Sequence, residues 1–266
     1  MAEIFDHLGE REKASELRSK AITLQARFEE KFWSEELGFY ALTLDPDKQA
    51  VHSISSNVGH CLWSGIVRRN HASRVAERLM RPEMSSGWGI RTLSTDNPAY
   101  NPFSYHRGSI WAHDNSIIAL GLKRYGYSEA VADTAKGIID AASYFTSYRL
   151  PELYAGVERT PGSFPVPYSD ANLPQAWAAA SVFQLLQAIL GLQADAPNRR
   201  LYVDPVLPEW LPDVTLSRVE IGNAEVDLRF WREGDRTHWE ANIQKGDIEV
   251  KQQAWQPWQL REAVSV

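Results

Sequence analysis

The spacing of the helix-forming segments constrains the fold of this chain more than any other feature. Ala14, Leu17 and Ala21 begin a series of apolar residues at intervals of three and four that runs to Phe32, which is typical of an amphipathic helix. Further helices are expected near 2–8, 57–69, 71–81, 109–125, 128–147 and 174–192. The connections between them are alternately short and long. If successive helices run antiparallel, every long loop emerges at the same end of the assembly.

The short connections carry turn signals. Gly126 ends one expected helix and Ser128 begins the next, which predicts a tight helix–helix turn. Similar short joints are expected at Asn70-His71 and Gly9-Glu10. The long connections, about 34–56, 82–108 and 148–173, contain too many aromatic residues for disorder. Loops of this length in a compact domain are then usually functional.

The helices differ in their polarity. Those that enter a short turn, 57–69 and 109–125, are apolar or built of small residues nearly all round, whereas 71–81 and 128–147 are amphipathic. A helix without a polar face must be covered on most sides. The sequence therefore predicts a mainly α fold, a toroid of hairpins with inner helices surrounded by outer ones. Each inner helix would begin at the rim with the long loops, so its free N–H groups would point into a site there.

From about residue 199 the apolar period changes to two. Residues 224–230 alternate apolar and polar, residues 239–243 do so again, and Glu233-Gly234-Asp235 is a plausible turn between them. We therefore expect two parts, a partial helical barrel at 1–195 and a short antiparallel β-rich appendage at 196–266.

Composition excludes several classes of partner. The 28 Lys+Arg against 34 Asp+Glu give a net charge of −6, which argues against nucleic acid. The single Cys61 excludes an internal disulfide framework, fits a reducing cytosol and is expected to be a buried, inert thiol. The first residues, MAEIFDHLGEREK, do not resemble a signal peptide, and no apolar run approaches the ~20 residues that span a bilayer. A soluble, cytoplasmic protein is expected, with no nucleic-acid or membrane partner.

Two segments, 101–115 and 149–177, combine aromatic, charged and turn-forming residues just before an apolar helix. Indole and phenol faces stack on a pyranose while polar groups bind its hydroxyls, so the pattern indicates a sugar site. Glu152 is the favoured carboxylate, because a general base for glycoside hydrolysis must be fixed beside the ring and reach a water. A capping or salt-bridged glutamate is an equally good interpretation of that residue.

The second cluster contains five candidate side chains. They are His106, Arg107, Trp111, His113 and Asp114. Their spacing matches no standard metal site, and Gly108-Ser109 lacks the G-x-S-x-G turn of a serine hydrolase, so neither metal nor cofactor is expected. A polar lining that orients sugar hydroxyls fits best. The alternative is that Trp111 and His113 only pack between helices, and for Asp114 a bond to a neighbouring amide is the stronger interpretation.

Three more residues have both a functional and a structural interpretation. Trp88 lies between two glycines, which can bring an indole close to a ligand but also occur at tight packing corners. Arg91 is expected either to bind hydroxyls or to pair with Asp96. Asn57, at the start of an inner helix, is expected to be a cap rather than a ligand group.

Five motifs together resemble one known family. In order they are SNVGHCLWSGI, SSGWGIRTLS, NPFSYHRGSIWAHDNSIIALGLKRYG, RLPELYAG and LPQAWAAAS. They resemble the C-terminal half of bacterial amylo-α-1,6-glucosidases, the glycogen-debranching-enzyme-like proteins, from Met1 to about Leu192. The resemblance implies an (α/α)6 barrel of six inner and six outer helices, an α-glucan or glucoside substrate, and hydrolysis with inversion.

The resemblance also implies roles for particular residues. Glu152, in RLPELYAG, would be the general base that activates water. The residues that would line the glucose subsite are Tyr105, His106, Trp111, Gln175 and Trp177.

The sequence departs from that family at one point. In that family the general acid lies in a W-K-D-S-like segment, and this sequence contains no such segment. Only about seven of the family's twelve barrel helices are expected in this chain. We therefore expect the C-terminal part of a longer enzyme, completed by an N-terminal half or by self-association. The alternatives are a trehalase-like or oligosaccharide-trimming glucosidase on the same ring, and an inert carbohydrate-binding remnant.

Overall fold

The computed structural model describes residues 1–255, and all seven expected helices are present in it. They are α1 (Ala2–His7), α2 (Arg11–Phe32), α3 (Asn57–Ser64), α4 (Arg69–Met80), α5 (Ala112–Arg124), α6 (Ser128–Ala142) and α7 (Ala176–Leu190). Two short 3-10 turns follow at Thr146–Tyr148 and Ala196–Asn198.

The joints between the helices agree with the sequence at two places and differ at one. Gly9 and Gly126 have φ of 80° and 89°, the left-handed conformation that ends a helix. The predicted joint at Asn70-His71 is wrong, because both residues lie inside α4. The preceding helix ends earlier, where Gly65 adopts φ 79° and ψ 14° and stops α3 at Ser64.

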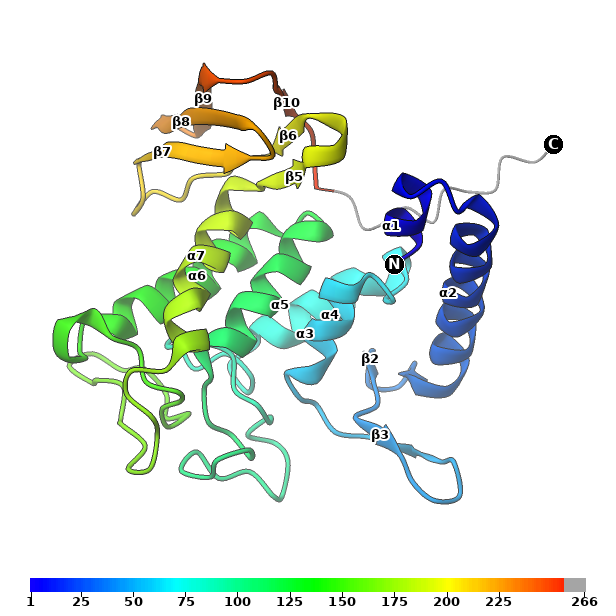
Figure 1. Cartoon of the computed structure of the whole chain (residues 1–266). Helices are drawn as coiled ribbons and strands as arrows, with labels where there is room; N and C mark the ends of the chain where they lie inside the picture. Colours follow the sequence, from blue (N-terminus) through cyan, green and yellow to red (C-terminus); the bar gives the residue numbers. More distant parts are fainter. Residues whose placement is uncertain (256–266) are drawn as a thin grey trace.

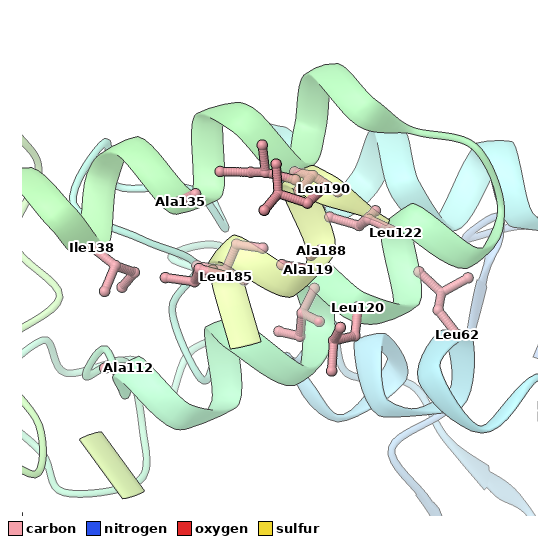
Figure 2. Packing of buried hydrophobic residues seen from close by; sticks show 14 of the residues in the cluster. Leu62, Ala112, Ala119, Leu120, Leu122, Ala135, Ile138, Leu185, Ala188 and Leu190 are labelled. Carbon is pink, nitrogen blue, oxygen red and sulfur yellow. The ribbon is translucent and has the colours of Figure 1, made fainter. Parts of the chain in front are cut away.

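The inner and outer helices are arranged as the polarity pattern predicts. Helix α5 packs between α3 and α7, while α4 contacts α3 and α6 contacts both α5 and α7 (Figure 1). The helices thus form part of an α-helical, toroid-like arrangement. Its apolar core includes Leu62 from α3, Leu122 from α5, Ile138 from α6 and Leu185 from α7 (Figure 2). A full ring of six hairpins is not present within residues 1–255.

Two glycines let α3 and α5 approach almost backbone to backbone. A Cβ on Gly59 would lie 2.4 Å from Cγ1 of Ile118, and one on Gly121 would lie 2.6 Å from the backbone N of Trp63. Ordinary carbon contacts are ~3.5–4.0 Å, so no larger residue fits either position without a shift. The separation of these two helices is therefore set by the glycines.

The sequence also predicts that an incomplete ring exposes the faces of inner helices, and α7 does so. Phe183 is 74% exposed, and Ala176 and Ala180, on the same side of this helix, are exposed as well. Phenylalanine is a residue type that is normally covered. No other part of residues 1–255 covers this side of α7.

The long loops are held in place by single β-bridges at one rim. The first long loop, between α2 and α3, contains two small hairpins, β1 (Trp33–Ser34) with β2 (Phe39–Tyr40) and β3 (Thr43–Leu44) with β4 (Ala50–Val51). Across the others, successive bridges join Arg91 to Ile110, Ile110 to Tyr154 and Tyr154 to Pro167. The loops therefore form a connected ladder over the start of α5.

Arg91 belongs to this ladder and has neither of its expected roles. Its guanidinium is buried and donates to the carbonyl oxygen of Gly156 at 2.6 Å and to that of Pro82 at 2.7 Å. The side chain ties two long loops together, in place of a bond to Asp96 or to a ligand.

The tail forms two three-stranded sheets. Its strands are β5 (Gln193–Asp195), β6 (Arg200–Val203), β7 (Asp213–Ile221), β8 (Ala224–Glu233), β9 (Arg236–Lys245) and β10 (Glu249–Gln252). The predicted antiparallel hairpin is present as β8–β9, and β7 pairs antiparallel with β8. The second sheet has the order β10–β6–β5. In it β10 runs parallel to β6, whereas the sequence predicted antiparallel pairing only.

The tail is attached firmly to the helices. Apolar residues of β6, β8 and the helices form one continuous cluster. Lys123 of α5 is 1% exposed, and its Nζ lies 3.0 Å from a carboxylate oxygen of Asp204, which follows β6. The division at residue 195 remains a prediction.

Candidate active site

A cavity of about 560 Å³ lies where the three inner helices begin. It is lined by Ser56, Asn57, His60, Thr92, Tyr105, His106, Trp111, His113, Asp114 and Trp177. The lining residues at 56–60, 111–114 and 177 lie at or within the first turn of α3, α5 and α7. The free N–H groups of these helix ends therefore meet at one place, at the rim that carries the long loops.

Aromatic side chains form one wall of the cavity. The rings of Trp177 and His113 stack with centroids 4.1 Å apart and planes 8° from parallel. Tyr105 meets Trp111 edge to face at 4.8 Å. The indole N–H of Trp111 donates to the Tyr105 carbonyl at 3.1 Å and to Oγ of Ser109 at 3.0 Å, which fixes its ring. The wall thus consists of oriented ring faces, as stacking on a sugar requires.

Glu152 is buried beside this wall and is held by three hydrogen bonds. The Tyr105 hydroxyl donates to Oε1 at 2.5 Å, while the side-chain and backbone N–H groups of Asn172 donate to Oε2 at 3.1 Å and 3.3 Å. These bonds, that of Tyr105 foremost, hold the pKa of Glu152 below its usual value. Glu152 is not itself a lining residue, and Tyr105 connects it to the cavity. The result is a fixed, ionised carboxylate.

His60 and Asp114 form a pair across α3 and α5. Nε2 of His60 lies 2.6 Å from Oδ1 of Asp114, whose residue is only 8% exposed. The expectation that Asp114 bonds a neighbouring amide is therefore wrong, because its partner is an imidazole from another helix. His113, next in the chain, is half-buried, and burial lowers its pKa.

The predicted substrate-binding residues divide into two groups. Tyr105, His106, Trp111 and Trp177 line the cavity. Trp88, Arg107 and Gln175 do not. The indole of Trp88 is 2% exposed and packs against Tyr144 and the guanidinium of Arg159, so its two glycines mark a packing corner.

Arg107 and Gln175 also lie outside the cavity lining. Arg107 is exposed, and its Nε donates to Oγ of Ser104 at 3.3 Å. Gln175 occupies the cap position of α7, where its carbonyl accepts from the N–H of Ala179. Both side chains therefore belong to the loops around the cavity rather than to its wall.

Sequence reasoning missed His60, Ser56 and Thr92 as lining residues. The predicted cap at Asn57 is wrong, because Ser56 occupies the cap position of α3 and Asn57, the first residue of the helix, lines the cavity. A signal for His60 was available, because it lies in the first turn of an expected inner helix, as His113 does. Within residues 1–255 no group of three or more His, Cys, Asp or Glu side chains has a geometry that holds a metal. The same residues contain no helix long and apolar enough to cross a membrane.

Comparison with known proteins identifies similar sequences and folds. Residues 1–154 match the family model of the mannosylglycerate hydrolase MGH1-like glycoside hydrolase domain. Mannosylglycerate hydrolase MGH1 of Selaginella moellendorffii is 35% identical over 68 residues, which cover 26% of this chain and 14% of that protein. The chain thus matches a small part of the length of this relative.

Two solved structures share the fold. A sialidase superposes with a TM-score of 0.73 at 13% identity, over 91% of this chain and 24% of that one. A GH63 mannosylglycerate hydrolase from Thermus thermophilus, in complex with glucose, gives a TM-score of 0.50 at 20% identity, over 66% of this chain and 39% of that one. The first match includes most of the β-rich tail as well as the helices.

Proposed function

This chain belongs to the mannosylglycerate hydrolase MGH1-like glycoside hydrolase family, and on that premise we propose that it carries the sugar subsite and general base of an inverting glycoside hydrolase. The observation that carries the proposal is the link from Glu152 through Tyr105 to the aromatic wall of the cavity. It joins a fixed, ionised carboxylate to ring faces suited to a pyranose.

Trp177 and Glu152 have different roles in the proposed hydrolysis. Trp177, which stacks on His113, offers a ring face to the apolar C–H groups of the sugar. Glu152, kept ionised by its hydrogen bonds, accepts a proton from the water that attacks the anomeric carbon. Inversion requires a second carboxyl group ~6.5–9.5 Å away on the other side of the scissile bond.

The source of that acid is part of the proposal. Among the lining residues of this cavity Asp114 is the only carboxylate, and it is engaged with His60. We propose that the acid comes from a further helical segment that covers the exposed face of α7, from an N-terminal half or a second copy. Adding such a segment is expected to restore hydrolysis to a chain that binds sugar but does not cleave it.

The substrate proposed is a small α-linked hexoside. The family match favours a compound such as mannosylglycerate, whereas the loop motifs resemble those of amylo-α-1,6-glucosidases, which act on α-glucan branches. The cavity, about 560 Å³, has the size of a site for a small ligand. A panel of mannosylglycerate, isomaltose, maltose, trehalose and a limit dextrin separates these possibilities.

The test of the function uses Glu152→Gln, with hydrolysis measured after the segment that supplies the acid has been added and sugar binding measured on the chain alone. The amide keeps the shape of the carboxylate but cannot take a proton, so hydrolysis is expected to fall at least ~10²–10⁴-fold while sugar binding persists. Glu158→Gln is the matched control, because Glu158 is exposed in the same loop and does not line the cavity. Equal loss in both variants, or full activity in Glu152→Gln, would refute the role of Glu152.

A further inference from the structure

A buried carboxylate stands behind an exposed imidazole in the cavity wall. The side chain of Asp114 is 11% exposed, whereas that of His60 is 40% exposed, and both residues line the cavity. An ionised carboxylate is costly to bury unless it is paired. The pair of His60 and Asp114, at 2.6 Å, meets that condition and places the imidazole on the solvent side.

The pairing determines which ring nitrogen of His60 is available. Because Nε2 faces a carboxylate oxygen, it carries the hydrogen, and in the neutral ring Nδ1 then keeps a free lone pair. No hydrogen bond of Nδ1 to another residue occurs in the part of the chain that the structure describes. A carboxylate that fixes the tautomer and orientation of a histidine is the usual way to prepare that ring for a specific contact.

The cavity has further polar lining residues, among them Asn57 and His106, but within residues 1–255 neither of these two is paired with a buried carboxylate as His60 is. The aromatic wall supplies ring faces, but specificity for a sugar needs polar atoms at fixed positions. Oδ2 of Asp114 and Nδ1 of His113 are buried without a hydrogen-bond partner among the described residues, so neither meets solvent. His60 is therefore an exposed acceptor at this side of the cavity whose orientation is fixed by a second side chain.

We propose that His60 is a sugar-binding residue, which accepts a hydrogen bond at Nδ1 from one hydroxyl of the bound hexoside, and that Asp114 is its positioning residue. This inference rests on the proposed sugar-binding function of the cavity. It adds a determinant of specificity, because an acceptor at one fixed point distinguishes sugars by the hydroxyl that reaches it.

The experiment measures binding rather than turnover. Methyl α-D-glucoside, methyl α-D-mannoside and their monodeoxy derivatives are titrated into the full chain by isothermal calorimetry. His60→Ala is expected to weaken binding about five- to tenfold, the effect of one hydrogen bond. His52→Ala is the matched control, because His52 is exposed and lies outside the cavity lining. Circular dichroism verifies that each variant is folded.

The decisive result is a coupling between the side chain and one hydroxyl. One deoxy derivative should lose affinity for the wild-type chain but lose none for His60→Ala, which a purely structural effect of the substitution would not produce. His60→Asn, whose amide oxygen can occupy the place of Nδ1, should restore part of the affinity. In Asp114→Asn the nitrogen-15 shifts of His60 should change from a single tautomer to a mixture.

Two outcomes overturn the inference in distinguishable ways. If the wild-type chain binds the sugars and His60→Ala binds them equally, with the same loss for every deoxy derivative, His60 is not a sugar-binding residue and the proposed function survives. If the wild-type chain binds none of them, the proposed function fails and the inference fails with it.

Discussion

The close approach of α3 and α5 allows a prediction of stability in which each contribution can be estimated. In Gly59→Ala the new Cβ would lie 2.4 Å from Cγ1 and 2.9 Å from Cγ2 of Ile118, a side chain that is fully buried. Overpacking of this kind costs about 1–3 kcal/mol. Alanine in place of glycine inside a helix returns about 1 kcal/mol. Because the new carbon is too close to two others, the upper part of the overpacking range, about 2–3 kcal/mol, applies, and we expect a net loss of about 1–2 kcal/mol in the free energy of unfolding.

A second substitution tests whether this contact is the cause. Ile118→Ala removes both Cγ atoms and alone should cost about 2–5 kcal/mol, because it leaves a cavity. In the double variant the alanine at 59 enters that space, so the two losses should not add, with a coupling of about 0.5–3 kcal/mol. Gly121→Ala is the contrasting case, since its Cβ would meet the backbone of Trp63 and Gly59, which trimming Ile118 cannot relieve.

The assay is urea unfolding followed by tryptophan fluorescence for the wild type, the two single variants and the double variant. Sugar affinity is measured alongside, because moving α3 away from α5 separates His60 from Asp114 and should weaken binding. Additive losses, or a Gly59→Ala variant as stable as the wild type, would refute the reasoning that the glycines set the helix separation.

Three other predictions follow from local environments. Tyr105→Phe removes the main cause of the lowered pKa of Glu152, so the acid limb of activity, or of a carboxyl NMR titration, should move to higher pH toward the ordinary value of 4.5. In the wild type the ionised carboxylate stabilises the fold above pH 4.5, and this stabilisation is lost as the pH falls through the folded pKa. Asp204→Asn leaves the buried ammonium of Lys123 without its carboxylate and should cost about 3 kcal/mol in urea unfolding, and a cost below about 1 kcal/mol would contradict a structural role for the pair. Burial raises the pKa of Cys61 from 9.0 to about 11, so alkylation by iodoacetamide at pH 8 should be about 100-fold slower than in urea, and equal rates would count against the buried environment.

Much of the helical fold could be predicted because its signals are local. The turn at Gly126 requires a residue that adopts φ 89° without steric cost from a Cβ, and a glycine at that position is visible in the sequence. The joint between α3 and α4 was predicted several residues C-terminal to its actual position. The apolar run continues past Gly65, and the prediction followed that run rather than the glycine that ends the helix. The parallel pairing of β10 with β6 was missed because a short strand carries no signal for its partner 49 residues away.

The lining of the cavity was predictable in composition but not in pairing. Tyr105, Trp111 and Trp177 line it and were predicted because aromatic residues beside turn-forming ones are visible in the sequence. His60 and Asp114 are 54 residues apart, and their contact depends on the crossing of two helices. Trp88 became a core residue because Gly137 on α6 offers no side chain, so a Cβ there would lie 3.0 Å from the carbonyl oxygen of Gly87. The residues next to Trp88 in the sequence give no indication that Gly137 packs against this segment.

The ladder of single bridges over α5 bears on how a ligand is recognised. Loops joined from Arg91 through Ile110 to Tyr154 and Pro167 have already lost most of their conformational freedom. Little ordering entropy then remains to be lost when a ligand binds, and each contact contributes almost fully to affinity. Such a rim selects its ligand by complementarity to a preformed shape, with fast association and discrimination expressed in the rate of release. Variation in specificity among chains of this design would then arise from exchanging side chains on a constant frame rather than from altering a closing motion.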